Sequence, residues 1–125
     1  MAEEINQIKK GNYILHKDEV VIIKEIGLVV YGTHSHAKMK VTVGGVFSEL
    51  NETFTLPLHH RVDKLDIIRK AAQLIALQGG SGQIMDNVSY ETKDVEIPEG
   101  LEVQEGDTVT FIEYGNKAKV LEKRS

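Results

Sequence analysis

Short runs in which apolar and polar residues alternate recur along this chain, and a period of two is typical of β-strands with one buried face. The clearest run is 38–43, where Met39, Val41 and Val43 alternate with lysine and threonine. Phe111 stands in a similar alternation and is expected in a core. The pattern predicts strands at residues 13–16, 20–26, 38–46, 53–58, 83–85, 88–97, 107–114 and 117–121.

The connections between these runs contain residues that favour tight turns. Lys17-Asp18-Glu19, Gly79-Gly80-Ser81-Gly82 and Gly115-Asn116 supply positions that tolerate a left-handed or self-bonded backbone. The glycines at 79–82 lack the Gly-Lys-Ser/Thr ending of a phosphate-binding loop, so a hairpin turn is the better interpretation. Many short strands with such turns predict an all-β barrel or sandwich.

Residues 66–77 give a conflicting signal. They are rich in helix formers, and Asp66 is a suitable N-cap, so local propensity alone predicts a helix. The apolar residues of the same segment also fit a strand that passes from one module to the next. Because propensity is a weak signal that tertiary context overrides, the pattern leaves both structures open.

The composition indicates a folded, non-secreted chain. It has 125 residues, of which 41% are hydrophobic, and it has no cysteine. Disulfides, a thiol nucleophile and thiolate metal ligands are therefore absent, and a reducing cytoplasmic location is expected. The acidic N-terminus is not followed by an apolar run, and no apolar run approaches the length of a membrane span, so no membrane partner is expected.

The charge is unevenly distributed along the chain. Residues 1–65 carry eight Lys and Arg against eight Asp and Glu, whereas residues 66–125 carry seven against eleven. An acidic half is poorly suited to bind nucleic acid by neutralising phosphates. RNA contacts are therefore expected mainly from the lysines of the first half, which are Lys9, Lys10, Lys17, Lys24, Lys38 and Lys40.

The shift in charge also suggests two modules. Pro57 ends a predicted strand and is followed by the charged run 61–64. We expect one module at residues 1–64 and a second at 65–125. Between two strands of the first module, residues 30–38 form a predicted hairpin tip that is exposed and available for contact.

Several short motifs are distinctive in combination. They are Lys10-Gly11-Asn12-Tyr13-Ile14, Gly32 with His34, His36, Ala37 and Lys38, Leu56-Pro57, Gln83-Ile84-Met85-Asp86, Tyr90-Glu91-Thr92 and Ile97-Pro98. Together they resemble the translation initiation factor 5A family of archaea and eukaryotes, which is related to bacterial elongation factor P. The resemblance implies an N-terminal SH3-like barrel followed by a C-terminal OB-fold, and it makes residues 66–77 mostly strand.

The resemblance breaks at one position of the tip. Members of the family place a lysine between the residues that correspond to Gly32 and His34, and this lysine is converted to hypusine. Here the position is Thr33, whose short hydroxyl cannot replace the long amine that the modification extends. Val30 and Ser35 also depart from the family pattern, in which a lysine and a glycine are expected. Hypusine is therefore not expected, whether Thr33 is natural or engineered.

By resemblance, the chain is a non-enzymatic translation factor that binds the ribosome and assists peptide bond formation without hypusine. The implied partners are the ribosome, tRNA and rRNA; a homodimer remains open, and no small-molecule substrate or cofactor is expected. The implied contact loop consists of Gly32, Thr33, His34, Ser35, His36 and Lys38. Two alternatives are a self-assembling structural paralogue, as in the Woronin body of fungi, and an RNA-binding module that acts off the ribosome.

Other chemistry receives little support from the sequence. His34 and His36 are two residues apart and, with His59 and His60, could assemble a metal site, but no third ligand type is signalled. No catalytic triad context appears. The second module has three aromatic residues, which are expected to be structural rather than stacking platforms for bases. Its acidic cluster is expected to be solvated and consists of Glu96, Glu99, Glu102, Glu105 and Asp107.

Overall fold

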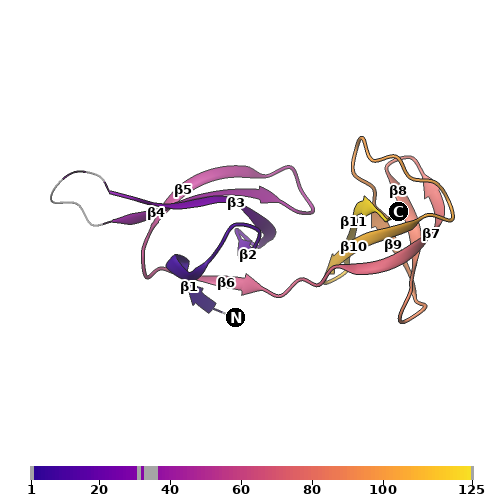
Figure 1. Cartoon of the computed structure of the whole chain (residues 1–125), viewed down its shortest axis with the longest axis horizontal. Helices are drawn as coiled ribbons and strands as arrows, with labels where there is room; N and C mark the ends of the chain where they lie inside the picture. Colours follow the sequence, from indigo (N-terminus) through magenta and orange to yellow (C-terminus); the bar gives the residue numbers. More distant parts are fainter. Residues whose placement is uncertain (1, 31, 33–36, 125) are drawn as a thin grey trace. The chain divides into compact units, whose positions relative to one another are not determined.

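The chain forms two compact units, Met1–Asp66 (unit 1) and Ile67–Ser125 (unit 2), in a computed structural model that describes residues 2–30, 32 and 37–124 (Figure 1). Both units consist of β-strands, and the described residues contain no α-helix. The prediction of an all-β chain is therefore confirmed.

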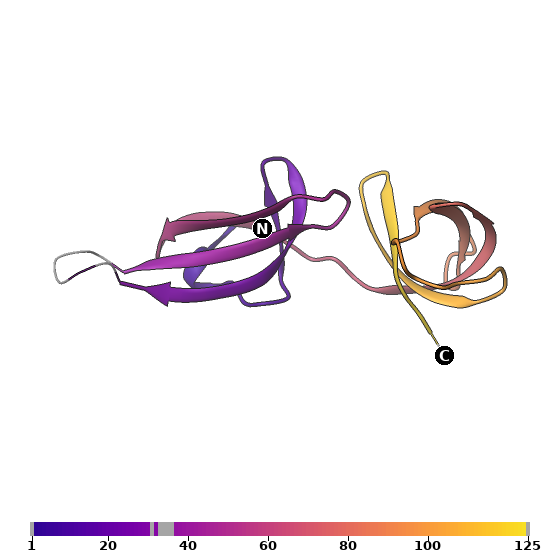
Figure 2. The same cartoon turned by 90° about the horizontal axis from the view of Figure 1, so that it is seen from above.

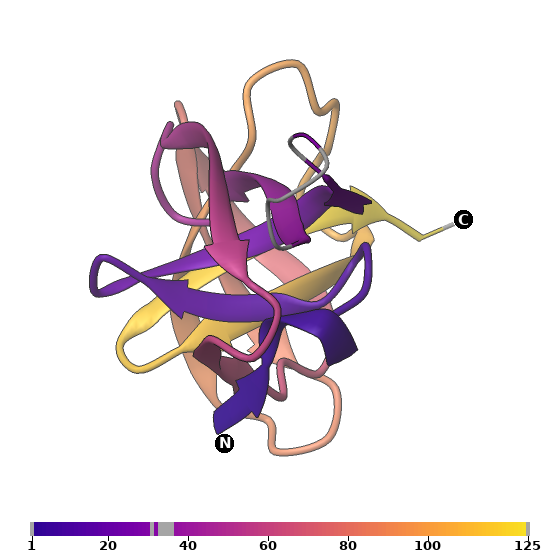
Figure 3. The ribbon, with the colours of Figure 1, turned by 90° about the vertical axis from the view of Figure 1, so that its left-hand side faces the viewer.

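Unit 1 contains one six-stranded sheet with the order β1-β6-β2-β3-β4-β5, in which all neighbours are antiparallel. Its strands are β1 (Ala2–Glu4), β2 (Tyr13–His16), β3 (Glu19–Val29), β4 (Lys38–Gly45), β5 (Asn51–Pro57) and β6 (Arg61–Leu65). Strand β1 leads directly into a single 3-10 turn, η1 (Ile5–Gln7), as Figure 3 shows. The turn between β2 and β3 is made by Lys17 and Asp18, both with a left-handed backbone, as the sequence predicts.

The sheet of unit 1 curls so far that side chains of β2 and β5, which are not neighbours in the sheet, come into contact. Glu52 on β5 accepts a hydrogen bond of 2.7 Å from Lys17 Nζ, and its other oxygen lies 3.2 Å from His16 Nε2. The ring of Phe54 stacks on His16, with centroids 4.6 Å apart and planes 10° from parallel. These contacts join strands that are not neighbours in the sheet, and they give unit 1 its SH3-like barrel form.

The core of unit 1 lies inside this curl. Alternation along β3 and β4 directs one face of each strand inward, so that Val21, Ile23, Val41 and Val43 are almost fully buried. The predicted split between inward Val41 and Val43 and outward Lys38 and Lys40 is confirmed. Side chains of the N-terminal segment and β2 complete the cluster: Ile5, Ile8 and Ile14.

Unit 2 is a closed five-stranded barrel with the order β7-β8-β9-β11-β10, in which β10 pairs back to β7. Its strands are β7 (Lys70–Gln78), β8 (Ser81–Asp86), β9 (Thr92–Glu96), β10 (Thr108–Tyr114) and β11 (Lys117–Lys123). All pairs are antiparallel except β9 with β11, which meet in parallel at Glu96 and Lys119. This five-stranded barrel is an OB-fold, and Figure 2 shows its strands curling around the core.

The core of unit 2 fills the barrel. Phe111 is fully buried, as predicted, although the alternation used for the prediction does not hold along β10, where Thr110 and Ile112 are buried as well. The other buried members of the cluster are Ala72, Leu74, Ile84, Val95, Ile97, Val103, Val109 and Val120. Burial of one such side chain contributes about 1.5–3 kcal/mol, and the chain has no disulfide to add to it.

The segment 66–77, for which local propensity favours a helix, is largely strand in the structure. Strand β7 begins at Lys70, and Ala72 and Leu74 point into the core while Gln73 and Ile75 are exposed. Ile75 is an extra residue between the pairs Leu74–Ile84 and Ala76–Gln83. This bulge bends β7 and helps the sheet to close.

Three parts of the sequence prediction were incomplete or wrong. The predicted strand 88–97 begins only at Thr92, because residues 87–90 form a turn that the Asp86 carboxylate fixes. The charged run 61–64 belongs to strand β6, whose alternation of exposed and half-buried residues was not recognised. Strand β1 was also missed, since three residues are too few to show a period.

The close approach of β7 and β8 generates a testable prediction. A Cβ atom at Gly82 would lie 2.7 Å from the backbone oxygen of Ala76 and 3.2 Å from Leu74 Cδ1. Gly82→Ala should therefore lower the free energy of unfolding by about 1–3 kcal/mol, as overpacking does. Urea denaturation measures the change. Gly80→Ala is the matched control, since nothing lies within 4 Å of its Cβ position; equal effects of both substitutions would contradict the steric explanation.

Candidate functional site

The predicted contact loop is held by the long hairpin of β3 and β4. The two strands pair without interruption from Glu25–Thr42 to Val29–Lys38. On its other side β4 pairs with β5 as far as Lys38–Pro57. The base of the loop is therefore supported by three adjacent strands, which run to it side by side in Figure 1.

The structure describes two of the six predicted loop residues. Gly32 is exposed and has φ of +87°, a left-handed conformation that glycine adopts without strain. Lys38 is the exposed first residue of β4. Thr33, His34, Ser35 and His36 lie outside the described residues, so the roles assigned to them remain predictions.

Two aliphatic side chains next to the loop are exposed to solvent. Leu28 is 61% exposed and Val30 62%. Leu28 shares a strand face with Ile26, which packs on the core of unit 1, but lies two residues closer to the tip. Its exposure was not recognised from the sequence, since alternation shows which face a residue is on but not where the core ends.

Lys38 and Lys40 add positive charge to the same hairpin. They are two residues apart on β4, so both project from the face opposite Met39. Neither lysine forms an ion pair with any described residue. The hairpin thus combines exposed aliphatic groups, two available cations and, near its end, a glycine with a left-handed backbone.

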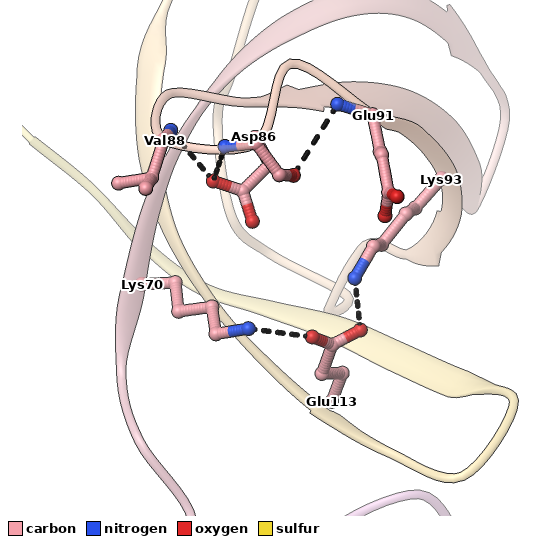
Figure 4. Close-up of polar contacts among 7 residues, drawn as sticks. Lys70, Asp86, Val88, Glu91, Lys93 and Glu113 are labelled. Carbon is pink, nitrogen blue, oxygen red and sulfur yellow. Dashed lines mark hydrogen bonds and ion pairs between the residues drawn. The ribbon is translucent and has the colours of Figure 1, made fainter.

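A cluster of ion pairs lies in unit 2, away from the predicted loop in sequence. The carboxylate of Glu113 on β10 accepts a hydrogen bond of 2.8 Å from Lys70 Nζ on β7 and a second one from Lys93 Nζ on β9. Each lysine meets a different carboxylate oxygen, as Figure 4 shows. The Lys70 ammonium first, and then that of Lys93, hold the pKa of Glu113 below its ordinary value. In return, Glu113 raises the pKa of Lys70.

Asp86 fixes the turn between β8 and β9 beside this cluster. Its carboxylate is buried and accepts hydrogen bonds from the backbone N–H groups of Val88 (2.8 Å) and Ser89 (3.3 Å) (Figure 4). The Val88 bond is the main reason that the pKa of Asp86 lies below its usual value. The arrangement is an Asx turn and holds its backbone rigidly.

The remaining sequence hypotheses concern a metal site and the acidic cluster of the second module. Within residues 2–30, 32 and 37–124, no three His, Cys, Asp or Glu side chains are grouped closely enough to hold a metal ion. His59 forms a hydrogen bond with Glu4, while His34 and His36 lie outside the described residues. In the acidic cluster, Glu96, Glu99, Glu102 and Glu105 are exposed, whereas Asp107 is half-buried and accepts a bond from the Gln104 N–H. Nor does the described part of the chain contain a helix that is long and apolar enough to cross a membrane.

Comparison with known proteins places the chain in a family. It is 35% identical over 122 residues to translation initiation factor 5A of Methanopyrus kandleri, covering 94% of this chain and 90% of the relative. It is 34% identical over 120 residues to the factor of the same name from Methanothermobacter thermautotrophicus, covering 94% and 92%. No family model matches the chain.

Solved structures agree with this result. The eukaryotic translation initiation factor 5A structure from Methanococcus jannaschii superimposes with a TM-score of 0.86 at 30% identity, over 99% of this chain and 94% of that one. A family protein from Naegleria fowleri shares the fold, with a TM-score of 0.72 at 21% identity over 100% and 98% of the two chains. The fold is thus that of a two-barrel translation factor. The chain belongs to the translation initiation factor 5A family, whose members are non-enzymatic translation factors.

The Glu113 cluster generates a second testable prediction. Because the folded-state pKa of Glu113 is lowered, its ion pairs stabilise the fold above the unfolded-state pKa, and this contribution is lost as the pH falls through the folded-state value. Glu113→Gln should therefore reduce the free energy of unfolding at neutral pH, and the difference from the unmodified chain should shrink in acid. Urea denaturation across the acid range measures both.

Glu122→Gln is the matched control for this prediction. Glu122 lies on the adjacent strand β11 and is exposed. We expect its substitution to leave stability nearly unchanged at every pH, as is usual for surface sites. A loss from Glu113→Gln that persists undiminished at low pH would contradict the electrostatic explanation.

Proposed function

We propose that this chain binds the ribosome and assists peptide bond formation during elongation, and that it does so without hypusine. The main support is its 35% identity to a translation initiation factor 5A over 94% of its length. The match extends through both units. The partners proposed are the ribosome with its rRNA and tRNA, in the cytoplasm.

We assign the ribosomal contact to the end of the β3–β4 hairpin. Lys38 and Lys40 offer cations to RNA phosphates, and Gly32 lets the backbone approach a surface closely. Exposed Leu28 and Val30 offer apolar contact area next to these polar groups. The loop residues proposed to make contact are Gly32, Thr33, His34, Ser35, His36 and Lys38.

Thr33 determines what kind of contact this is. A lysine side chain ends in a flexible ammonium group, whereas threonine ends in a hydroxyl and a methyl group close to the backbone. Thr33 thus has no amine to which an aminobutyl group could be attached. We infer that this loop acts through shape and short-range hydrogen bonds rather than through an extended cation.

This inference predicts the intact mass of the protein. When the chain is expressed together with the enzymes that make hypusine, its mass should equal that calculated from the sequence. A family member with lysine at the position of Thr33, expressed in the same cells, is the control and should gain the increment. Detection of a hypusine or aminobutyl increment on this chain would contradict the role given to Thr33.

The ribosomal contact is tested by sedimentation with archaeal ribosomes. At low salt the tagged full-length chain should appear in the ribosomal fraction, and Lys38→Glu with Lys40→Glu should lower that amount by about tenfold or more, since two phosphate contacts become repulsive. Lys117→Glu with Lys123→Glu, at two exposed lysines of unit 2, is the charge-matched control. Absence of the unmodified chain from ribosomes at low salt would refute the proposal.

The same preparation separates the two alternative functions. Light scattering over a concentration series that shows reversible growth beyond a dimer would favour a structural, self-assembling protein. Crosslinking followed by sequencing of the bound RNA would favour an RNA-binding module off the ribosome if the reads are not ribosomal. Neither alternative is supported by a specific contact in the described residues.

A further inference from the structure

Unit 2 contains an open pocket of about 620 Å³, and the aliphatic side chains that line it do not belong to the core cluster of unit 2. We call it the Arg69 pocket. Residues from three segments line it. Ile68 and Arg69, just before β7, lie in the first segment together with Ala71 on β7. The second is the turn after β8, with Val88 and Ser89, and the third is Arg124, which follows β11. A backbone hydrogen bond of 3.1 Å from Asn87 N to Ala71 O joins the turn to β7, and one of 2.8 Å from Arg124 N to Thr108 O fixes Arg124 to the start of β10.

The apolar side chains of this pocket are left in solvent. Ile68 is 69% exposed and Val88 is 87% exposed, although each is large enough to stabilise a core. The neighbouring Tyr90 is 73% exposed. Ile68 and Val88 thus place two exposed aliphatic side chains at one pocket, and exposed apolar patches mark interaction sites.

The turn that displays Val88 is rigid and strained. Asp86 binds the N–H groups of Val88 and Ser89, and Tyr90 has φ of +60°, a left-handed conformation that costs a non-glycine residue about 1–2 kcal/mol. Figure 4 shows the Val88 side chain directed away from the Asp86 carboxylate. The turn therefore presents Val88 in a fixed position, and little conformational entropy would be lost on binding.

The charge around the pocket is positive, in contrast to the rest of unit 2. The Glu113 carboxylate is paired with Lys70 and Lys93, and the buried Asp86 carboxylate accepts hydrogen bonds from backbone N–H groups. Among the other residues that line the pocket, Arg69 and Arg124 carry positive charge and Glu91 carries the one further carboxylate. Arg124 Nε is held 2.7 Å from Thr110 Oγ1, which directs the guanidinium group, while Arg69 has no ion pair among the described residues.

We propose that the Arg69 pocket docks a short acidic peptide segment of a partner protein, with one large apolar side chain next to a carboxylate. The apolar side chain would contact Ile68 and Val88, and the carboxylate would pair with Arg69 or Arg124 in the bidentate geometry that guanidinium groups favour. Nucleic acid fits less well, because two arginines in a unit with seven basic and ten acidic residues neutralise few phosphates. The pocket includes no residue of the β3–β4 hairpin, so this proposal goes beyond the ribosomal function.

The test uses the isotopically labelled full-length chain and a synthetic probe peptide, acetyl-Glu-Asp-Leu-Phe-Glu-Asp-amide. Titration should shift the backbone amide signals of Arg69, Val88 and Ser89 before those of other residues. A control peptide with lysine in place of every acidic residue should cause no such shifts. Arg69→Glu and Val88→Ser should each weaken binding by about tenfold, which corresponds to the loss of one ion pair or one good apolar contact.

Two matched variants separate the pocket from general charge and hydrophobicity. Lys117→Glu makes the same charge change as Arg69→Glu at another exposed site, and Leu77→Ser removes a partly exposed aliphatic group elsewhere. Both should bind the probe like the unmodified chain, and the amide spectrum of each variant shows that it is folded.

Several results would overturn the proposal. These are no shifts at the pocket with the acidic probe, equal shifts with the lysine peptide, or unchanged affinity in both Arg69→Glu and Val88→Ser. Displacement of the probe by a short uridine-rich RNA would identify nucleic acid as the occupant instead. If dilution of the chain without any probe shifts the same amide signals, the occupant of the pocket is a second copy of the chain.

Discussion

The structure depends on closing two small β-sheets on themselves. Each unit has only about sixty residues, the chain has no cysteine, and its described residues include no α-helix that could cover a sheet, so a flat sheet would leave one apolar face in water. Unit 2 closes completely through the pairing of β10 with β7. Unit 1 curls until Glu52 and Phe54 reach the end of β2, where His16 and Lys17 complete the turn of the sheet. Once both cores are enclosed in this way, the remaining surface is available for function.

The functional surfaces lie where strands or turns extend beyond those cores. Strands β3 and β4 continue their pairing past the last well-buried residues and support the contact loop at its base. In unit 2, the Asp86 turn extends in a similar manner and presents Val88. In both places exposed aliphatic groups stand next to cations that the described residues do not neutralise. One small scaffold thus carries both the loop that we propose contacts RNA and the separate pocket that we propose docks a peptide.

Most of the fold could be predicted from the sequence, because alternation and turn residues are local signals. Strands β2, β3 and β4 were found with small errors in their ends, and Phe111 was correctly placed in a core. Segment 66–77 required more, since its helix formers adopt a strand only because β8 and β10 pair with β7. The turn at 87–90 was missed because it depends on the Asp86 side chain. Within the site, the loop was predicted from motifs alone, whereas the exposure of Leu28 and the Arg69 pocket depend on where the cores end.

The parallel pairing of β9 and β11 has a consequence for the mechanical behaviour of unit 2. This seam is the shortest in the barrel, with Glu96 and Lys119 as its one paired position. Glu113 on β10 forms an ion pair with Lys93 on β9, although β11 lies between these two strands in the barrel. Strands β9 and β11 are held mainly by their other neighbours, β8 and β10. The Lys93–Glu113 ion pair joins strands on either side of this seam, so protonation of Glu113 in acid would remove a contact across the shortest pairing of the barrel.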